Sequence, residues 1–431
     1  MTPQRPNTAA APIHRSAAVR VRLAHLSARG AGLAARLRGG RASVFPGYVA
    51  LKVAPDLLTG LLAGRTVCLI SGTNGKTTTT AMVASTLGAG VVTNRDGANL
   101  PTGWVSTLLE APVGPVVLEV DESYLPAALD AAPEAVVALL NLSRDQLDRH
   151  SETRMLAVRW RDALAAHPLV QVVANVDDPL VVWAASAVSR VTWVAGGAEW
   201  HSDAAACPAC GALLERTIDT ESGASWSCPA CALARPAPSI EGDTAGLRVD
   251  GEDFAYELAL PGRANRGNVA MAMGAAHALG VTTRNALDAI AGVREVSGRY
   301  ARHRVGDHDM IVLLAKNPAG WVETLDVIDD LLPDKTGTVV VAINARGPDG
   351  RDPSWLWDVP FEQLAGRDVI ATGERATDLA VRLEHAGVAY RKDTRAPLLA
   401  AGGALHNPVV IAATYTNFLS VSRELDGLRD G

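Results

Sequence analysis

The chain has 431 residues, of which 48% are hydrophobic and 20% charged, and its formal net charge at pH 7 is −6. A chain of this length can bury the cores of two or three domains. No uninterrupted run of 18 apolar residues occurs, which excludes a membrane-spanning helix. The acidic balance argues against a general nucleic-acid binder, and we expect no nucleic-acid partner.

The first 55 residues differ from the rest of the chain in charge. They contain eight arginines and one lysine but no acidic residue, and the first carboxylate is Asp56. The stretch RSAAVRVRLAHLSARGAGLAARLRGG could form a basic amphipathic helix that suits an anionic membrane surface, but a solvated helix or a frayed tail is the favoured interpretation. Because the apolar core of a signal peptide is missing, we expect 1–55 to be a partly disordered or helical segment of a cytoplasmic protein; peripheral contact with the inner face of the cell membrane is the alternative that stays open.

Short β-branched runs alternate with longer helical stretches from about residue 65 onward. The first runs are TVCLIS, PVVLEV and AVVALL, and a later series reads DMIVLLAKNP, GTVVVAINA, RDVIATG and NPVVIAATY. Such alternation is typical of an α/β fold with a parallel sheet, whose ligands bind at the carboxyl ends of the strands. We therefore expect a central domain at 56–298 and a C-terminal α/β domain at 299–431.

The stretch SGTNGKTTTT lies between a predicted strand and a predicted helix. In this context the Lys76 side chain should reach the terminal phosphates of a nucleotide, and the Thr77 hydroxyl should hold Mg²⁺. The full motif has a glycine where this chain has Ile70. Backbone N–H groups of four consecutive residues should surround the phosphates: Gly72, Thr73, Asn74 and Gly75. The sequence thus predicts a site for ATP and Mg²⁺.

Acidic residues end the predicted strand in LEVDESY. A carboxylate on the strand beside a phosphate loop commonly serves the magnesium of the nucleotide. We assign this role to Glu119. For Asp121 and Glu122 the favoured interpretation is a solvated acidic turn.

Four of the five cysteines form two CPAC knuckles separated by 17 residues: Cys207, Cys210, Cys228 and Cys231. This spacing lets two turns present four thiolates to one Zn²⁺ ion, with no open coordination position. We therefore expect a structural zinc ribbon inserted at about 200–240. The fifth cysteine, Cys68, lies in an apolar run, and a disulfide framework is not indicated.

The order and spacing of GTNGKTT, NLSRDQLDRH, NVDDP and LPGRANRGN resemble the central ATPase domain of the Mur ligase family. The resemblance covers about 65–431. It implies an enzyme that uses ATP to activate a carboxylate as an acyl phosphate, which an amine then attacks. By the same resemblance, Asn268 and Arg299 should contact ATP, Asn175 and Asp177 are weaker candidates, and Lys316 takes part in the C-terminal domain or in an ordinary salt bridge.

Two positions depart from the family pattern. Peptide-forming members usually have a histidine where this chain has Gln146, and they often carry a carbamylated lysine on the next helix, where this chain offers Arg159. A second magnesium bound in that way is therefore not expected.

The four-cysteine insertion, LLAKNPAGW and DGRDPSWLWD narrow the resemblance to the amidating branch of the family. This implies an ATP-dependent carbon–nitrogen ligase that converts the D-glutamate of lipid II, or a related peptidoglycan precursor, to D-isoglutamine. Ammonia would come from glutamine, hydrolysed by a GatD-like class I glutaminase subunit in a heterodimer. The resemblance implies that Asp352 completes the catalytic Cys–His pair of that partner; capping of a local turn is the alternative.

The neighbours of Asp352 have other expected roles. Asp349 is interpreted as a structural turn residue. Trp355 and Trp357 are expected either to anchor the partner or to pack in the core.

Two rival functions stay open at this point. The first is a ligase that adds an amino acid, as ordinary Mur ligases do. The second is an ATP-driven zinc-ribbon protein that acts on nucleic acid. The insertion contains only two arginines, Arg216 and Arg235, and no lysine, which disfavours the second.

Overall fold

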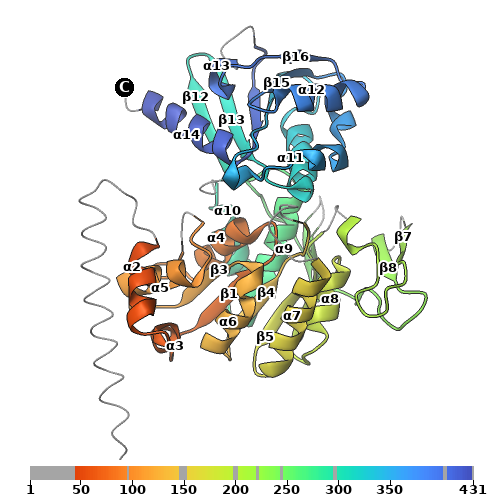
Figure 1. Ribbon diagram of the computed structural model, residues 1–431. Coiled ribbons are helices and arrows are strands. Elements are labelled where there is room, and N and C mark those ends of the chain that lie inside the picture. Colours follow the sequence, from red (N-terminus) through yellow and green to blue (C-terminus); the bar gives the residue numbers. More distant parts are fainter. Residues whose placement is uncertain are drawn as a thin grey trace, which may run out of the picture.

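The computed structural model describes residues 44–94, 97–144, 153–197, 202–219, 223–242, 246–294, 299–400 and 405–429. Two α/β units stand one above the other, with the chain running from the lower into the upper (Figure 1). Most of the predicted basic segment, residues 1–43, and Gln146 lie outside the described residues. No helix within the described ranges has the length and hydropathy that a bilayer crossing requires.

The central unit is built on a nine-stranded sheet in the order β11-β10-β9-β6-β5-β4-β1-β3-β2. Strands β1 to β6 and β9 run parallel to one another, and β10 runs antiparallel to both β9 and β11. The strands are β1 (Val67–Ser71), β2 (Val92–Thr93), β3 (Val116–Val120), β4 (Val136–Leu139), β5 (Gln171–Asn175), β6 (Val191–Ala195), β9 (Ile240–Gly242), β10 (Leu247–Val249) and β11 (Glu252–Phe254).

Helices cover both faces of this sheet, as expected for a doubly wound fold (Figure 1). They are α2 (Phe45–Val53), α3 (Leu57–Leu62), α4 (Lys76–Thr86), α5 (Pro101–Glu110), η1 (Glu122–Tyr124), α6 (Leu125–Ala131), α7 (Thr153–Ala166), α8 (Pro179–Ala185), α9 (Arg263–Ala278) and α10 (Thr283–Ala291). Residues 45–53, which the sequence placed in the basic segment, form α2 and pack against α5.

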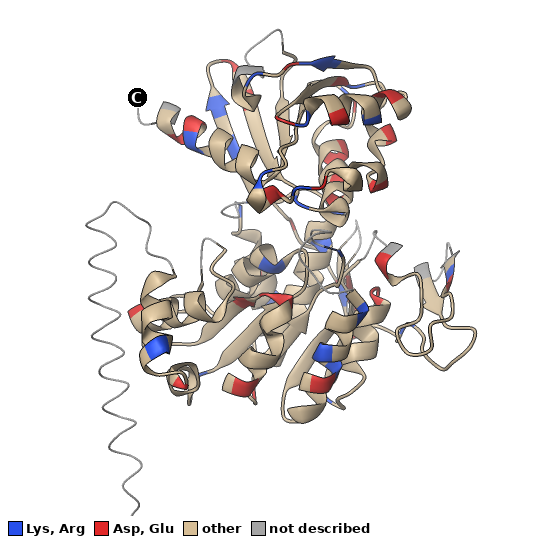
Figure 2. Cartoon of the chain, in the orientation of Figure 1, with Lys and Arg blue, Asp and Glu red and all other residues tan. Residues whose placement is uncertain are grey.

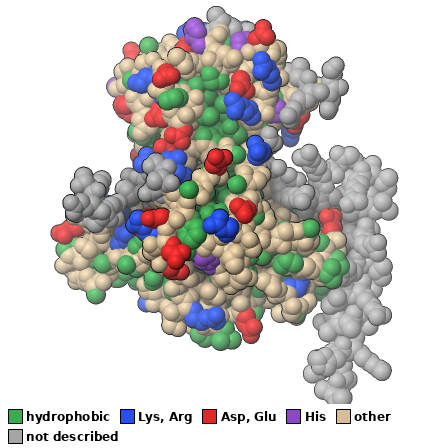
Figure 3. Space-filling view, turned by 180° about the vertical axis from the view of Figure 1, so that it is seen from behind, with side chains coloured by type: hydrophobic (Ala, Val, Ile, Leu, Met, Phe, Trp, Pro, Cys, Tyr) green, Lys and Arg blue, Asp and Glu red, His purple; other side chains and the backbone are tan. Residues whose placement is uncertain are grey.

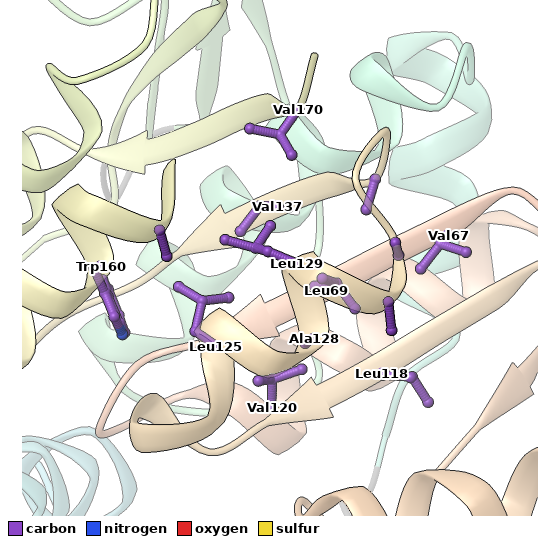
Figure 4. Close-up of a cluster of buried hydrophobic side chains, with 14 of the residues drawn as sticks. Val67, Leu69, Leu118, Val120, Leu125, Ala128, Leu129, Val137, Trp160 and Val170 are labelled. Atoms are coloured by element: carbon purple, nitrogen blue, oxygen red, sulfur yellow. The ribbon is translucent and has the colours of Figure 1, made fainter. Parts of the chain in front are cut away.

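The alternation of side chains along each strand divides the core into two layers. In β1, Val67 and Leu69 pack toward α6 and α7, whereas Cys68 and Ile70 pack toward α4 and α9. Figure 4 shows the first layer, with Leu125 and Leu129 of α6 above the strands and Trp160 of α7 beside them. Burial of both faces explains why these strands are uninterrupted apolar runs.

The C-terminal unit has a six-stranded sheet in the order β12-β13-β17-β14-β15-β16, of which only β12 is antiparallel. Its strands are β12 (Tyr300–Val305), β13 (His308–Leu314), β14 (Thr338–Ala342), β15 (Asp368–Thr372), β16 (Tyr390–Lys392) and β17 (Val409–Ala413). Its helices are α11 (Pro318–Leu331), η3 (Gly347–Asp349), η4 (Ser354–Asp358), η5 (Phe361–Leu364), α12 (Ala376–His385), α13 (Pro397–Ala400) and α14 (Tyr415–Arg429).

The two units meet through α9 and α11. Arg263 pairs with Asp326 at 3.2 Å and Arg266 with Asp330 at 3.7 Å. The backbone N–H of Gly262 also donates to Asp330 at 2.9 Å. Seen from behind, the molecule narrows between the units, and acidic and basic side chains both gather at this waist (Figure 3).

The cysteine-containing insertion is a small unit at the side of the central sheet (Figure 1). It consists of η2 (Ser202–Ala204) and the antiparallel pair β7 (Glu215–Asp219) and β8 (Gly223–Ser227). It is anchored through Trp226, which is 3% exposed and donates its indole N–H to the carbonyl of Val176 at the end of β5.

Candidate nucleotide site and domain cleft

The loop between β1 and α4 depends on two glycines in positive-φ conformations. Gly72 has φ 153° and Gly75 has φ 80°. A Cβ atom on Gly72 would lie 2.8 Å from Leu140, and one on Gly75 would lie 2.5 Å from the side-chain oxygen of Asn268. A side chain at either position would therefore displace a neighbour as well as strain the backbone.

Hydrogen bonds to the segment that follows β4 hold the loop in its conformation. The backbone N–H of Thr73 donates to the carbonyl of Asn141, and that of Asn74 donates to the Asn141 side chain at 2.8 Å. The hydroxyl of Thr73 bonds both the N–H and the carbonyl of Ser143. Two of the four N–H groups that the sequence assigned to phosphate thus shape the loop instead.

Helix α4 begins directly after this loop, at Lys76. An α-helix leaves its first N–H groups without intrahelical acceptors and carries a partial positive charge at that end. In α4 this end is formed by Lys76 and Thr77. The N–H groups of Lys76 and Thr77 are therefore further candidate donors to a phosphate group, beside those of Gly72 and Gly75.

Lys76 is buried and paired in the site. Its ammonium group lies 3.0 Å from the carboxylate of Glu122 and also donates to the carbonyls of Gly72 and Thr73. Both side chains of the ion pair are less than a tenth exposed. The interpretation of Glu122 as a solvated turn residue is wrong: η1 folds it under the phosphate loop, and the Trp160 indole fixes that turn by donating to the Glu122 carbonyl at 2.8 Å.

Thr77 and Glu119 come together as the sequence predicted. The Thr77 hydroxyl donates to the Glu119 carboxylate at 2.9 Å, and Glu119 is 4% exposed. Adjacency of β1 and β3 places them side by side. The backbone of Glu119 is fixed by the Asn94 amide and by the Trp104 indole. A hydroxyl and a carboxylate so held suit a hard divalent cation such as Mg²⁺.

A cleft between the two units opens directly beside the phosphate loop. It is lined from the central unit by Asn74, Gly75, Thr78, Leu260, Asn265 and Asn268, and from the C-terminal unit by Arg299, Tyr300, Lys316, Glu323 and Thr324. Asn268 accepts the Thr79 hydroxyl at 3.2 Å. Lys316 lies with its ammonium group 5.1 Å from the ring centre of Tyr415. The structure therefore brings the predicted residues Asn268, Arg299 and Lys316 to one cleft.

An amide pair joins the phosphate loop to the C-terminal unit. The side chains of Asn74 and Asn317 exchange two hydrogen bonds of 3.4 Å, and they are 6% and 1% exposed. Asn317 also caps α11 by accepting the N–H of Gly320 at 2.8 Å. Sequence reasoning missed Asn317, because its role depends on how the two units pack.

The Asp352 carboxylate lies away from this cleft, on the surface of the C-terminal unit. It is exposed and accepts the backbone N–H of Ser354 at 2.9 Å. Asp349, three residues earlier, is 4% exposed and accepts both the N–H and the hydroxyl of Thr416, as expected of a structural residue. The two tryptophans separate: Trp355 packs against Trp321 in the core, whereas Trp357 is 55% exposed.

The weaker candidates have structural contacts. Asn175 is 2% exposed and bonds four backbone groups at the strand end, those of Leu140, Asp177, Gly196 and Gly197. Asp177 forms an ion pair with Arg235 at 2.8 Å. Arg159 is exposed on α7.

The four predicted zinc ligands form one cluster. All four sulfur atoms lie within 4.8 Å of one another, with 3.6 Å between Cys207 and Cys231 and 3.4 Å between Cys210 and Cys228. Zn–S bonds of about 2.3 Å in a tetrahedron require sulfur separations of about 3.8 Å. Within the described ranges this is the one group of three or more side chains arranged to hold a metal, and its geometry fits zinc.

Metal removal should expose four thiols and leave the fifth protected. Cys68 is fully buried in β1, and burial raises the pKa of its thiol to about 12, so it is not expected to react in the folded chain. A disulfide-exchange reagent should count four thiols after chelation and five after denaturation. Cys228→Ser should lose the metal, whereas the control Cys68→Ala should keep one equivalent. Metal loss in Cys68→Ala would contradict the assignment.

Asp178, at the start of α8, is hydrogen-bonded to the segment after β4 that supports the phosphate loop. Its carboxylate is 5% exposed and accepts the N–H of Leu142, in the segment below the loop, at 2.7 Å. It also caps α8 through Leu180 and Val181. Burial raises the pKa of Asp178 to about 6, although these N–H groups and the charge of Arg216 favour the ionised form.

This raised pKa predicts a pH dependence of stability. The pKa of Asp178 in the folded chain is about 6, above the ordinary value of about 3.9. Its contribution to the free energy of unfolding is therefore full below pH 4 and is lost as the pH rises through 6, by about 3 kcal/mol. Urea unfolding of wild type and Asp178→Asn at pH 4.5 and pH 7 should show wild type losing stability relative to the variant. An unchanged difference would contradict this pKa.

The chain is thus an α/β protein of two units, with a glycine-containing loop of the phosphate-binding type beside a cleft that both units line. Two family models match the chain: the Mur ligase middle domain over residues 70–206 and the MurT ligase C-terminal domain over residues 314–418. Both units of the chain are therefore similar to domains of Mur ligases.

Relatives with assigned names support the same placement. The chain is 29% identical to the MurT subunit of lipid II isoglutaminyl synthase (glutamine-hydrolyzing) from Streptococcus pneumoniae, over 83% of this chain and 85% of the relative. It is also 29% identical to the MurT subunit from Staphylococcus aureus, over 82% and 85%. Among solved structures, a pseudomurein peptide ligase type C from Methanothermus fervidus has the same fold, with a TM-score of 0.64 and 18% identity over 86% of this chain and 80% of that chain.

Proposed function

We propose that this chain is the ligase subunit of a glutamine-dependent amidotransferase that acts on the D-glutamate α-carboxylate of lipid II or a related peptidoglycan precursor. The observation that carries the proposal is the arrangement of Lys76, Thr77 and Glu119 beneath a cleft that the MurT-type C-terminal domain closes. The similarity to MurT subunits over more than four fifths of both chains supplies the substrate class. The reaction takes place in the cytoplasm, at the inner face of the membrane.

The first chemical step is phosphoryl transfer. A carboxylate oxygen of the substrate forms a bond to the γ-phosphorus of ATP while the bond from that phosphorus to ADP breaks. Lys76 and the N-terminus of α4 stabilise the charge on the transferring group. Thr77 and Glu119 would hold a Mg²⁺ ion, which would neutralise phosphate charge.

The second step is the attack of ammonia on the acyl phosphate. The nitrogen lone pair forms a bond to the carbonyl carbon, the bond to phosphate breaks, and the ammonia proton leaves to solvent or phosphate. Water would destroy the same intermediate, so the closed cleft is as important as the reacting groups. The contacts of Asn74 with Asn317 and of Arg263 with Asp326 hold that closure.

The partner is a GatD-like class I glutaminase, and it docks against the turn that carries Asp352. The exposed Asp352 carboxylate completes the Cys–His pair of the partner. The half-exposed Trp357 ring, which lies edge-on to His385, offers an anchor beside it. The cysteine cluster would hold a structural Zn²⁺ ion.

The two rival functions have little support in the structure. The two arginines of the insertion are engaged with the protein, since Arg216 donates to the carbonyl of Ala204 and Arg235 pairs with Asp177. Figure 2 shows the insertion with few basic residues, which disfavours nucleic-acid binding. For the addition of an amino acid, the exposed Arg159 supplies no metal-bridging group.

The direct test supplies the chain with Mg·ATP, ammonium and lipid II that carries unamidated D-glutamate. The expected product, identified by mass spectrometry, has the α-carboxylate replaced by a carboxamide, with one ADP formed per amide. Free amino acids offered in place of ammonium should give no product. Incorporation of an amino acid would overturn the proposal in favour of an ordinary peptide-forming Mur ligase.

A further inference from the structure

Arg144 joins the central unit to both of its neighbours, the insertion and the C-terminal unit. It lies in the segment after β4. Its backbone N–H and its Nε atom donate to the two carboxylate oxygens of Asp203 in the insertion, at 2.9 Å and 2.5 Å. Its guanidinium group also donates to the carboxylate of Asp358 in the C-terminal unit, at 3.3 Å. One side chain thus contacts parts of the molecule that are far apart in the sequence.

The two carboxylates that Arg144 contacts differ in burial. The Asp203 side chain is 6% exposed, and a buried carboxylate that loses its donors is costly, so this end of the contact is firmly held. The Asp358 side chain is 40% exposed. Exposed ion pairs contribute little to stability. The contact with Asp358 can therefore form and break without unfolding either unit, which a coupling element requires.

The residue before Arg144 is bonded directly to the phosphate loop. The Thr73 hydroxyl accepts the N–H of Ser143 at 3.0 Å and donates to the Ser143 carbonyl at 3.1 Å. The Asn74 side chain donates to the Ser143 hydroxyl at 3.4 Å. Because one peptide bond joins Ser143 to Arg144, a displacement of the loop would reach the base of the arginine side chain.

The other end of the contact belongs to the turn that carries Asp352. Asp358 is the last residue of η4, and Ser354, the first residue of η4, donates its N–H to Asp352 at 2.9 Å. Arg382 of α12 holds the end of the turn by donating to two of its backbone carbonyls, at 3.2 Å and 2.7 Å. Since these bonds tie the turn together, a displacement of Asp358 would also displace Asp352.

We propose that Arg144 is a positioning residue that couples occupancy of the nucleotide site to the conformation of the turn that carries Asp352. Bound Mg·ATP shifts the phosphate loop, Ser143 carries the shift to Arg144, and the contact with Asp358 passes it to the turn. The consequence for the partner rests on the proposed function: glutamine hydrolysis is faster when ATP is bound, so ammonia is released when an acyl phosphate can form.

The first experiment uses the chain alone, with neither partner nor substrate. The nine tryptophans are replaced by 5-fluorotryptophan, and the fluorine resonance of Trp357 is identified by its absence from Trp357→Phe. This ring precedes Asp358 in η4, and its centre lies 5.2 Å from that of the His385 ring, so its resonance reports on the position of the turn. A non-hydrolysable ATP analogue with Mg²⁺ should shift this resonance in wild type but not in Arg144→Gln or Asp358→Asn.

The variants are chosen to separate coupling from loss of the fold. Asp358→Asn keeps the size of an exposed side chain, and Arg144→Gln keeps the backbone N–H that binds Asp203. Asp358→Glu retains the charge and should keep the shift. The matched control Arg154→Gln removes an arginine of α7 that also bonds the insertion, at the carbonyl of Pro208, and it should respond like wild type. A cooperative thermal unfolding transition establishes that each variant is folded.

The second experiment measures glutamine hydrolysis by the assembled heterodimer with and without the same analogue. In wild type the analogue should raise kcat/KM for glutamine about fivefold, at the lower end of the couplings found between distinct sites. In Arg144→Gln and in Asp358→Asn the ratio of the two values should be close to one. The control Arg154→Gln should keep the wild-type ratio.

Three results would overturn the coupling. They are a wild-type resonance that the analogue does not move, a shift that persists in Arg144→Gln and Asp358→Asn, and hydrolysis whose response to the analogue in these variants equals that of wild type. The proposed function can fail separately. If no glutaminase subunit supports hydrolysis while the Trp357 resonance still responds through Arg144, the assignment of the partner is wrong and the coupling stands.

Discussion

Replacement of Asp352 by asparagine should abolish glutamine-dependent amidation and leave ammonium-dependent amidation intact. In the proposed complex the Asp352 carboxylate orients the catalytic histidine of the glutaminase, and loss of such a carboxylate lowers turnover by factors of a hundred to about ten thousand. The asparagine side chain keeps a carbonyl that can accept the N–H of Ser354, so the turn should survive. Glutamine hydrolysis and both amidation reactions are measured in the assembled heterodimer.

Two other carboxylates of the C-terminal unit provide the controls. Asp378→Asn changes an exposed residue of α12, whose 3.7 Å contact with Arg375 lies within the same unit and is itself exposed, and it should leave both activities unchanged. Asp349→Asn removes the buried acceptor of two Thr416 bonds, and it should destabilise the C-terminal unit and lower both activities together. Unchanged glutamine hydrolysis in Asp352→Asn would make Asp352 a turn residue and leave the ligase assignment standing.

The parts of the site that the sequence predicted are those governed by local spacing. Gly75, Lys76 and Thr77 are adjacent in the chain, and a strand–loop–helix unit can present them in only one way. Glu119 required one further step, that its strand lies beside β1, which the sheet order confirms. The cysteine cluster was equally predictable from the sequence, because two short knuckles determine all four ligand positions.

The parts that sequence reasoning missed depend on contacts between distant segments. Glu122 follows Glu119 by three residues, but its burial depends on the Trp160 indole from α7. The pairing of Asn74 with Asn317, 243 residues apart, depends on how two separately folded units meet. Secondary-structure propensity and hydrophobic patterning do not indicate how two folded units pack against each other. One signal for Glu122 was available in the sequence. Lys76 lies in a loop between an apolar strand and a helix, where it is expected to be buried, and a buried charge requires a partner of opposite charge.

Replacement of Lys76 by methionine should lower the rate of ADP formation about a thousandfold. The methionine side chain fills the space of the lysine stem but supplies no charge to the transferring phosphoryl group, and removal of one such stabilising donor costs factors of a hundred to a thousand or more. ADP formation is measured with saturating substrate and ammonium. Retained binding of Mg·ATP would place the loss in the chemical step.

The same substitution leaves Glu122 buried without its partner, and this second effect has to be separated from the first. Breaking a buried ion pair on one side costs about 3–5 kcal/mol of stability, and both members here are less than a tenth exposed. Lys76→Met/Glu122→Gln removes both charges, so it should recover much of the stability of the single variant while remaining inactive. Glu122→Gln alone should keep most of the activity, because the Gly72 and Thr73 carbonyls still hold the lysine. If Glu122→Gln is instead as inactive as Lys76→Met, Glu122 acts on the nucleotide or its metal directly, and the acidic turn after β3 belongs to the catalytic machinery.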